Sequence, residues 1–496
     1  MDTPLVRLLS ALTQLGQDGA ITPSIYDTAQ CIRFATWHNV KPAISWLLDQ
    51  QYADGGWGDP HEPLHRIIPT LSAILALQII NPHTPEIAAA LKLLQEIDQL
   101  WPRELPPDLS VAAEIIIPNL VAEARVAHLD VPPFADQALM EFSRRRMERL
   151  KQQAIAAGSP ALHSWEIWGA DADENLLDGA GSIGHSPSAT ALWLHRAQHP
   201  SFERARTRAL RYIHQSAAAT GVHIYGVVPT VWPISRFEQT FSLYGLATLG
   251  LLQQPEIQLF IAPIVDDLLQ RLRTAGGTGM SDAFQTDGDT TAAAVAIVRA
   301  AGRQGPQAIE IFQPFMSSGF TAYPGEMHGS ISVQGRMLQQ LAIDGYNIDV
   351  EVGRLCTRQL PDGTWPRDKW NVSWLYSAWH AMLPLSLAPP SEAVEQALDS
   401  TMHALRRQQH PDGGWGPTSS QLPDTTFAML ALLVLQPRFD AVIQPMLAPA
   451  HHWLDQHIDD PVPDTWIGKQ LYSPILVDRI LSLTALVASR AVLGAE

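Results

Sequence analysis

Cysteine, lysine and basic charge are all scarce in this sequence, and each shortage excludes a class of protein. The 496 residues contain two cysteines, Cys31 and Cys356, too few for a disulfide framework or a thiolate zinc site. We therefore expect buried free thiols in a reducing compartment. The formal net charge of −17 argues against a nucleic-acid surface, because polyanions bind to basic stripes.

Long uncharged apolar runs and the features of a signal peptide are missing too. Residues 1–16 (MDTPLVRLLSALTQLG) carry an early acid, Asp2, and leucines at helical spacing, which predicts a helix rather than a signal peptide. We see no segment that approaches the length of a membrane span, so we expect a soluble, cytoplasmic protein. The sequence also lacks a P-loop, a GxGxxG fingerprint, Cys/His zinc spacing and a nucleophile elbow.

Helical periodicity is abundant in the sequence, whereas strand signals are weak throughout. Apolar residues recur at helical spacing in segments bounded by Pro, Gly or Asp, namely 110–127, 236–253, 330–343, 391–408 and 423–436. The 38 prolines and 32 glycines fall mainly between such segments. We predict an all-α chain with short connections, and its length favours two large domains.

The pattern Gln-x-x-x-Gly-x-Trp occurs three times and indicates a repeated helical unit. It lies at 51–57 (QYADGGW), 359–365 (QLPDGTW) and 409–415 (QHPDGGW), each time after a helix-like run. We expect the glycine to adopt the positive-φ turn that ends a helix. The glutamine amide would satisfy loop backbone groups while it covers the indole. The repeats predict stacked helical hairpins, as in an α/α barrel, and belong to the scaffold rather than to the chemistry.

The most unusual polar segment is residues 280–302 (MSDAFQTDGDTTAAAVAIVRAAG). Asp287 and Asp289 flank a glycine, and Thr290 and Thr291 follow at the start of an Ala/Val helix. Such residues are often simple N-caps or solvated loop residues, but two acids and two hydroxyls exceed what one cap requires. In a dry pocket an aspartic acid keeps its proton well above its usual pKa of about 3.9. One carboxyl can then act as a Brønsted acid while its neighbours orient it.

A second segment, residues 366–382 (PRDKWNVSWLYSAWHAM), concentrates charged and aromatic side chains. They are Arg367, Asp368, Lys369, Trp370, Trp374, Tyr376, Trp379 and His380. Aromatic residues at helical spacing usually belong to a core, and we expect this for at least two of the three tryptophans. The chain's 15 tryptophans nevertheless suit a pocket that stabilises a carbocation by cation–π attraction, since good nucleophiles would quench the cation.

Basic side chains suited to an anionic group occur in two motif-like segments. The chain has only five lysines, at positions 41, 92, 151, 369 and 469. Lys369 is close to Arg367, and Lys469 lies in TWIGKQLYSP. Lysine is most often a surface residue, but the placement of two of the five lysines in these segments favours an anion-binding role.

These segments resemble those of bacterial class II diterpene cyclases. The matching pieces extend essentially throughout the chain, from residue 24 to residue 474, and are together highly specific. They are SIYDTAQ, the Gln-Trp repeats, IIIPNLVAEA, HSPSATALW, WPISRFEQTF, YPGE, DGDTT, RDKWNVSWLYSAWH and WIGKQLY. The Asp-x-Asp-Thr-Thr variant is similar to that of the halimadienyl (tuberculosinyl) and kolavenyl diphosphate synthases within this family.

The resemblance implies an α/α double barrel with the βγ terpene cyclase architecture and no α domain. The β domain, which carries the acid motif, would comprise residues 1–30 and 230–496. An inserted γ domain would comprise residues 31–229. The implied reaction is the protonation-initiated cyclisation of geranylgeranyl diphosphate to a bicyclic diterpenyl diphosphate of the halimadienyl, kolavenyl or copalyl type. It is an isomerisation in which the diphosphate is retained.

The resemblance also implies roles for the acidic residues. The family's Asp-x-Asp-Asp motif corresponds to Asp287, Asp289 and Thr290, so Asp289 takes the place of the general acid and a threonine replaces the third acid. Glu166, in LHSWEIW, corresponds to a glutamate linked to Mg²⁺, the implied cofactor, and to the diphosphate. Gln30 stands where the family has the tryptophan of YDTAW, and we assign that segment no role.

The implied substrate site combines basic, aromatic and imidazole groups. Lys369 and Lys469 correspond to basic positions near the diphosphate, with Arg367 as a further basic candidate. Aromatic faces are expected from Trp370, Trp374, Tyr376 and Tyr472. His380 and His328 are candidates for the terminating base, although a structural role is the commoner one for each. Expected partners are a prenyl diphosphate, a downstream class I terpene synthase or phosphatase, and a second copy of the chain.

Other interpretations compete with this one. A squalene-hopene-like triterpene cyclase or a sesquiterpene class II cyclase shares the scaffold, but a triterpene cyclase would be longer and carry more Gln-Trp repeats. Ionisation-type terpene chemistry needs a third acid, which is missing after Asp266 and Asp267. A protein prenyltransferase subunit needs a cysteine zinc ligand. A glycan-active barrel would use Asp287 and Asp289 as paired carboxylates, and a catalytically dead scaffold would explain Thr290.

Overall fold

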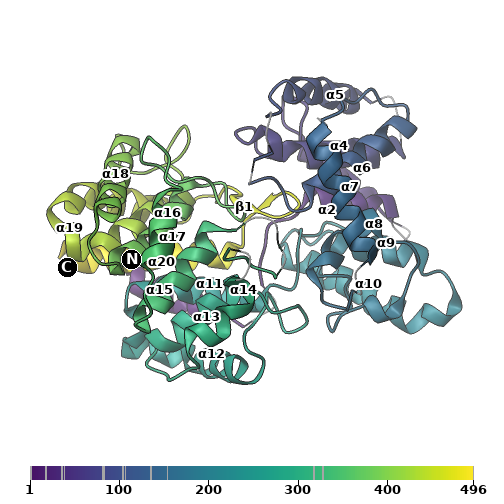
Figure 1. Ribbon diagram of the computed structural model, residues 1–496. Coiled ribbons are helices and arrows are strands. Elements are labelled where there is room, and N and C mark those ends of the chain that lie inside the picture. The colour runs from purple at the N-terminus through teal and green to yellow at the C-terminus, as the bar shows by residue number, and fades with distance from the viewer. Residues whose placement is uncertain are drawn as a thin grey trace.

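The protein folds into two groups of helices, which Figure 1 shows side by side. The computed structural model describes residues 3–494, apart from 17–18, 35–36, 38, 81–83, 103–104, 107, 135–136, 153–154, 317–318, 325 and 327–328. We call the group that contains α1 and α11–α20 the C-terminal lobe, and the group that contains α2–α10 the insert lobe.

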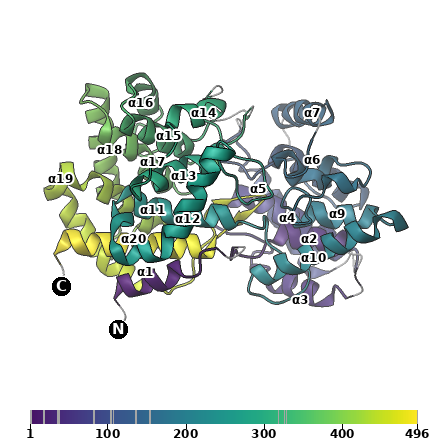
Figure 2. The ribbon, with the colours of Figure 1, turned by 90° about the horizontal axis from the view of Figure 1, so that it is seen from below.

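Six helices of the C-terminal lobe form a closed ring in which each packs against the next. In order around the ring they are α11 (Ser235–Thr248), α13 (Gly288–Ala300), α15 (Ile331–Ile343), α17 (Trp374–Leu387), α19 (Leu422–His457) and α20 (Ile475–Leu493), which returns to α11. Outside the ring lie α1 (Pro4–Leu12), α12 (Pro255–Thr274), α14 (Ala308–Met316), α16 (Asp349–Cys356) and α18 (Glu392–Gln408). The arrangement is an α/α barrel, and Figure 2 shows α1 lying along α20.

The insert lobe repeats this plan with a second, smaller ring. Its inner helices are α2 (Ile25–Phe34), α4 (Ile67–Gln78), α6 (Ala113–Val126), α8 (Trp165–Trp168) and α9 (Pro187–Arg196), which returns to α2. The remaining helices are α3 (Lys41–Asp49), α5 (Pro85–Asp98), α7 (Gln137–Gln152) and α10 (Glu203–Ala219). A short hairpin of β1 (Trp466–Ile467) and β2 (Leu471–Tyr472) lies at the junction of the lobes (Figure 1).

The position of α2 bears on the expected domain boundary. The buried side chains of α2, such as Ile25 and Ala29, pack in one hydrophobic cluster with α4, α5 and α6. The predicted boundary at residue 30 therefore falls inside a helix of the insert lobe. We propose that the first segment of the C-terminal lobe ends before Ile25 and that the division is otherwise as expected.

The three Gln-Trp repeats make the contacts expected of helix stops. The amides of Gln51, Gln359 and Gln409 each donate to the carbonyl of the repeat's own glycine, at 2.8, 3.1 and 2.8 Å. Each amide also reaches a backbone carbonyl of a following helix. The glycines have φ angles of 94°, 84° and 100°, and all three indoles are buried. The prediction of a structural role is confirmed.

One helix qualifies the expectation that no segment approaches a membrane span. By length and composition α19 is apolar enough to cross a membrane, but 56% of its apolar window is buried inside the protein. The helix is also interrupted at Phe439, whose φ and ψ are −126° and 29°. Because α19 packs against α17 and α20 in the ring, its apolar surface is that of a core helix.

Candidate active site

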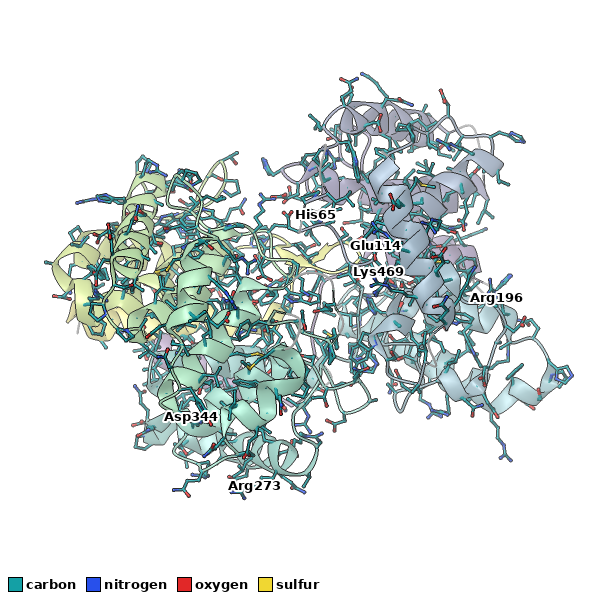
Figure 3. All side chains as sticks on the ribbon, viewed as in Figure 1. His65, Glu114, Arg196, Arg273, Asp344 and Lys469 are labelled. Atoms are coloured by element: carbon teal, nitrogen blue, oxygen red, sulfur yellow. The ribbon has the colours of Figure 1, made fainter. Side chains whose placement is uncertain are left out.

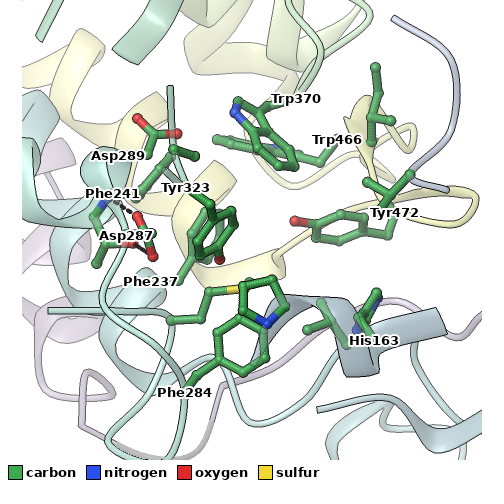
Figure 4. Close-up of a pocket in the computed structure, with 18 residues that line it drawn as sticks. His163, Phe237, Phe241, Phe284, Asp287, Asp289, Tyr323, Trp370, Trp466 and Tyr472 are labelled. Atoms are coloured by element: carbon green, nitrogen blue, oxygen red, sulfur yellow. Dashed lines mark hydrogen bonds between the residues drawn. The ribbon is translucent and has the colours of Figure 1, made fainter. Parts of the chain in front are cut away.

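A cavity lies between the two lobes, beside the N-terminus of α13 (Figure 4). The empty space within it, including the part open to solvent, is about 790 Å³. The insert lobe contributes Val111, Pro160 and His163 to its wall. The C-terminal lobe and the chain that leads into it contribute Val231, Phe237, Phe241, Met280, Phe284, Asp287, Asp289, Thr290, Ala322, Tyr323, Trp370, Trp466, Ile467, Gly468 and Tyr472.

Asp287 begins α13 and is both an N-cap and a wall residue. Its carboxylate accepts hydrogen bonds from the Thr290 backbone N–H at 2.6 Å and from the Thr290 hydroxyl at 2.9 Å. Burial raises the pKa of Asp287 to about 8, and these hydrogen bonds oppose the rise only in part. Asp287 is therefore protonated near neutral pH and orients Thr290. Asp287 is thus the N-cap of α13 and also the predicted neighbour of the acid Asp289.

Thr291 has a different role from Thr290. It is fully buried, its hydroxyl donates to the Thr278 carbonyl at 3.0 Å, and it accepts from the Thr278 N–H at 3.0 Å. These bonds fasten the loop that precedes the acid segment. Thr291 is absent from the cavity wall, and its contacts are with the loop that leads to Asp287.

Asp289 lies in the first turn of α13 and faces the cavity from a buried position. Burial raises its pKa, and the guanidinium of Arg336 opposes that rise. Arg336 comes from α15 and donates from Nη1 to Asp289 Oδ1. From Nη2 it donates to the hydroxyl of Tyr376 at 3.0 Å. A charged partner for Asp289 is the feature of the site that the sequence interpretation missed.

Aromatic rings surround the space in front of Asp289. Phe237 and Phe241 lie 4.1 Å apart between centroids, and each packs against Trp466, at 5.5 and 5.7 Å. Phe284 and Tyr323 form a further pair at 6.4 Å. Ring faces attract cations, and aliphatic and aromatic walls exclude water. The cavity can therefore hold an apolar chain and stabilise positive charge on it.

The predicted aromatic residues fall into two groups. Trp370 and Tyr472 line the cavity as expected. Tyr376 is fully buried one layer behind, with its ring 5.3 Å from that of Trp466, and it contacts the acid only through Arg336. Trp374 lies instead beside a separate polar cavity. The predictions for Trp370 and Tyr472 thus agree with their position, whereas Trp374 is away from the site.

His380 lies behind Tyr376 and away from the cavity. Its Nδ1 donates to the Tyr376 carbonyl at 2.8 Å, and burial lowers its pKa well below its usual value. This position agrees with a structural role. His328, the other candidate base, lies outside the described residues. His163 lines the cavity at the end away from Asp289 (Figure 4).

His163 is a neutral imidazole. Burial, followed by the nearby Lys469 ammonium, lowers its pKa to about 3. Its Nδ1 donates to the Gly184 carbonyl at 3.0 Å, because a carbonyl can only accept, so Nε2 carries the lone pair. Among the described residues no hydrogen-bond partner for Nε2 is found. This nitrogen is a base within the cavity wall that the sequence interpretation did not identify.

The three predicted basic residues do not converge. Arg367 makes a bidentate ion pair with Glu62 of the insert lobe, with both contacts at 2.7 Å, beside the polar cavity. Lys369 pairs with Glu326 at 2.6 Å, and its ammonium lies 4.8 Å from the centre of the Trp370 ring. Of the three, Lys369 is the one whose charged group lies over a ring that lines the candidate site.

Lys469 is completely buried at the junction of the lobes (Figure 3). Its ammonium contacts Asp27 at 3.3 Å and Glu166 at 2.8 Å. It also donates to the hydroxyls of Ser186 and Ser188, both at 2.6 Å. These four partners occupy its ammonium group. The predicted contact of Lys469 with the diphosphate is not supported by this position.

Glu166 belongs to the same cluster, and the donor set around it does not fit Mg²⁺. Its Oε1 accepts from the Tyr26 hydroxyl at 2.9 Å, from Ser188 at 3.0 Å and from Lys469. The lysine ammonium occupies the place between Glu166 and Asp27 where a cation would bind, whereas Mg²⁺ needs an octahedral shell of oxygen ligands. In the part of the chain that the structure describes, no three His, Cys, Asp or Glu side chains are grouped to hold a metal ion.

The residues that sequence reasoning missed had signals of different strength. Phe237, Phe241 and Trp466 lie in segments already recognised as matching, WPISRFEQTF and WIGKQLY, but nothing local indicates which rings face the cavity. One feature of the sequence could have singled out Arg336: it is a charged residue within the predicted apolar helix over 330–343. A charge on such a helix either reaches solvent or has a buried partner, and the structure supplies the partner.

Comparison with known proteins gives the family. The squalene-hopene cyclase C-terminal domain model matches residues 327–433. A (+)-kolavenyl diphosphate synthase of Herpetosiphon aurantiacus is 37% identical over 98% of both chains. A type B diterpene cyclase of Mycobacterium tuberculosis is 29% identical over 97% of this chain and 98% of that protein.

The fold agrees with a solved structure of the same length. The ent-copalyl diphosphate synthase of Streptomyces platensis matches with a TM-score of 0.76 and 25% identity over 98% of both chains. This match, together with the two helical rings, confirms the expected α/α architecture. With a relative 37% identical over nearly its whole length, this chain belongs to the bacterial class II diterpene cyclases.

Proposed function

We propose that this protein protonates the terminal alkene of geranylgeranyl diphosphate at Asp289 and forms a bicyclic diterpenyl diphosphate that keeps its diphosphate group. The observation that carries the proposal is a buried carboxylic acid on the wall of an aromatic-lined cavity. Relatives named for kolavenyl and ent-copalyl diphosphates support a product of this class.

Initiation is a proton transfer from Asp289 to carbon. The O–H bond of the carboxylic acid breaks as a C–H bond forms at the terminal alkene carbon. The π electron pair makes the new bond, so a tertiary cation remains on the substrate and a carboxylate remains on the enzyme. Attack by the next two double bonds closes two rings. Asp287 and Thr290 hold the start of α13, and thereby Asp289, in place.

Cation stabilisation falls to the rings that face the cavity. Phe237, Phe241 and Trp466 form one cluster, and Trp370 and Tyr472 are on the same cavity wall. Because the wall is mainly apolar, these rings act in a medium of lower dielectric constant than bulk water, where electrostatic stabilisation is stronger. The cascade ends when a base removes a proton, and the neutral Nε2 of His163 is our candidate for that base.

We assign the diphosphate contact to Lys369, whose ammonium lies over the ring of Trp370 in the cavity wall. In this proposal Arg367 and Lys469 form ion pairs between the lobes, and Glu166 is the partner of Lys469. Initiation by Asp289 requires no metal at Glu166. We further propose a cytoplasmic enzyme whose product passes to a class I terpene synthase or a phosphatase, and which forms a homodimer.

The test is product analysis. Purified protein is incubated with geranylgeranyl diphosphate, with Mg²⁺ and in parallel with a chelator, and products are identified by mass spectrometry before and after phosphatase. We expect a cyclic C20 alcohol after phosphatase treatment only, and a loss of about 10²–10⁴-fold in Asp289→Asn. Asp344→Asn, which alters the carboxylate at the end of α15 that pairs with Arg299 in the last turn of α13, is the control. A cyclic product that Asp289→Asn forms at the normal rate would refute the proposal.

Rival functions give different results in the same assay. Squalene or farnesyl diphosphate as the better substrate would identify a triterpene or sesquiterpene cyclase. A cyclic hydrocarbon released without phosphatase would mean that the diphosphate is lost by ionisation. Unreacted substrate throughout would favour a catalytically dead scaffold. The position of the new double bond reports which carbon lost its proton, and so whether His163 is near enough to act.

A further inference from the structure

Arg336 is a buried cation beside a site that generates a second cation. Its side chain is 1% exposed. It lies with its guanidinium 4.1 Å from the Phe241 ring centre and 4.9 Å from that of Tyr244. It contacts Asp289 and Tyr376, and its Nε has no hydrogen-bond partner among the described residues. A buried arginine stays charged and is costly without a paired anion. The groups that contact Arg336 must therefore offset the cost of burying its charge.

Of the contacts that Arg336 makes, the one with Asp289 involves the proposed proton donor. Phe241 and Asp289 both line the cavity, whereas Tyr244 and Tyr376 are packed behind it. Two aromatic faces and one phenol hold the guanidinium in a fixed place, so that its Nη1 is directed at Oδ1 of the acid. Thr290, which replaces the family's third acid, instead donates to Asp287. In this chain the direct partner of Asp289 is thus a cation.

We propose that Arg336 is the residue that makes Asp289 a strong enough acid to protonate an alkene, by stabilising the carboxylate that remains after the proton has left. The inference rests on the proposed function, in which Asp289 is the proton donor. Arg336 does not touch the substrate in this proposal and acts as a positioning residue.

The physical reason lies in the two states of the pair. Before transfer, neutral Asp289 leaves the Arg336 charge without its anion in a buried place, which is costly. Transfer breaks the O–H bond, gives the proton to the alkene carbon and leaves a carboxylate. The carboxylate and guanidinium then form a complete ion pair. The transfer thus restores an interaction that the ground state lacks, so it lowers the barrier rather than only binding the substrate.

Burial and Arg336 act on the proton of Asp289 in opposite directions. Burial raises the pKa of Asp289 and keeps the carboxyl protonated, whereas Arg336 lowers the pKa and makes Asp289 a stronger acid. The other charged or titratable groups that face the pair are Asp287, Asp368, Lys369, Tyr244, Tyr323, Tyr376, Tyr472 and His380. Asp368 and Lys369 affect Asp289 in opposite directions and so cancel in part.

The experiment compares Arg336→Gln, which removes the charge, with Arg336→Lys, which keeps it. The pH dependence of kcat/KM is measured for both, beside Arg299→Gln, an arginine of α13 that pairs with Asp344 away from the cavity. Activity needs protonated Asp289, so the rate falls above its pKa. We expect Arg336→Gln to lose about 10–1,000-fold in maximal rate and to shift its alkaline limb to higher pH. Arg336→Lys should lie nearer the wild type, and Arg299→Gln should match it.

A second measurement does not depend on activity. The infrared carboxylic C=O band of Asp289, obtained as the difference between each protein and its Asp289→Asn counterpart, is followed against pH. In the Arg336→Gln background we expect this band to persist to higher pH than in the wild type. A slower Arg336→Gln enzyme whose alkaline limb and carboxyl band both titrate as in the wild type would show a merely structural role and overturn the inference.

The outcome also separates this inference from the proposed function. If Asp289→Asn is inactive but the charge at position 336 leaves the titration of Asp289 unchanged, only the role of Arg336 fails. If Asp289→Asn cyclises normally, the proton donor itself is misassigned and both proposals fail.

Discussion

At the residue scale, the site contains two neighbouring carboxyl groups with different partners. Asp287 receives hydrogen bonds from the backbone and hydroxyl of Thr290, whereas Asp289 has the Arg336 guanidinium. Burial raises the pKa of both, but the cation opposes the rise for Asp289. Pairs of acids whose environments separate their pKa values take different roles. Asp287 is suited to remain neutral and orient the segment, and Asp289 to give up its proton.

A pH dependence of stability follows for Asp287. Its pKa is about 8 in the folded protein, against about 3.9 in the unfolded chain. Between these pH values the folded state binds the additional proton, so stability from this group is full below pH 4 and is lost as pH rises to about 8. We expect the free energy of unfolding to fall between pH 5 and pH 8 by more in the wild type than in Asp287→Asn. The difference should approach, at most, about 1.4 kcal/mol per pH unit.

Urea unfolding at several pH values measures this difference. Asparagine is also a good N-cap and keeps an acceptor for the Thr290 N–H, so the substitution removes the titration while retaining the cap. Other buried acids, such as Asp464 and Asp478, titrate alike in both proteins and cancel. Parallel stability curves for the two proteins would show that Asp287 is ionised in the folded state at neutral pH.

At the element scale, the site depends on how closely α15 and α17 approach. Gly335, next to Arg336, has no room for a side chain, because a Cβ there would lie 2.2 Å from the His380 carbonyl oxygen of α17. That approach brings Arg336 of α15 to Tyr376 of α17, and Arg336 also reaches Asp289 of α13, the neighbouring helix in the ring. A glycine in the middle of a helix normally costs stability. Here it permits the contact between the helices.

Gly335→Ala is therefore expected to force α15 away from α17. We predict a loss of about 1–3 kcal/mol in unfolding free energy, as is typical of overpacking, and a fall in kcat because Arg336 moves away from Asp289. Gly353→Ala in α16 is the matched control, since nothing lies within 4 Å of a Cβ at that position. The control should gain about 0.5–1 kcal/mol. Equal effects of the two substitutions, measured by urea unfolding and kcat, would contradict the packing argument.

At the scale of the whole molecule, buried and partly buried ion pairs join the lobes whose surfaces form the cavity. Lys469 connects the loop between β1 and β2 to Asp27 of α2 and Glu166 of α8. Arg367 connects the C-terminal lobe to Glu62. Residues 466–468, just before Lys469, are part of the cavity wall. The lobe contacts therefore hold one side of the candidate site in position.

A structural role and a substrate-binding role for Lys469 predict different effects of its substitution. Lys469→Met leaves two buried carboxylates without their cation, so we expect a loss of about 3–5 kcal/mol in unfolding free energy. The exposed Lys92→Met is the control and should stay within about 0.5 kcal/mol of the wild type. A variant of normal stability with a raised KM for geranylgeranyl diphosphate would instead assign Lys469 to the diphosphate.

The sequence by itself determined the features that depend on neighbours along the chain. Helical periodicity predicted α6, α15 and α18 to within a few residues, and the Gln-Trp repeats predicted helix stops whose amides bond to their own glycine four residues on. An N-cap was one of the interpretations open for the segment with Asp287 and Thr290, three residues apart, and the structure has Asp287 as the cap. In each case the partners lie within one helical turn, so local residue type and spacing suffice.

Only the tertiary structure decided which distant groups became partners. Arg336 meets Asp289 across 47 residues, and Lys469 meets Asp27 across 442. Basic residues that the sequence suggested for one anion are instead divided between the lobe junction and the edge of the cavity. The sequence shows which side chains are charged, but the partner of each charge depends on how whole helices pack. In a buried site that partner sets the protonation state, and with it the chemistry.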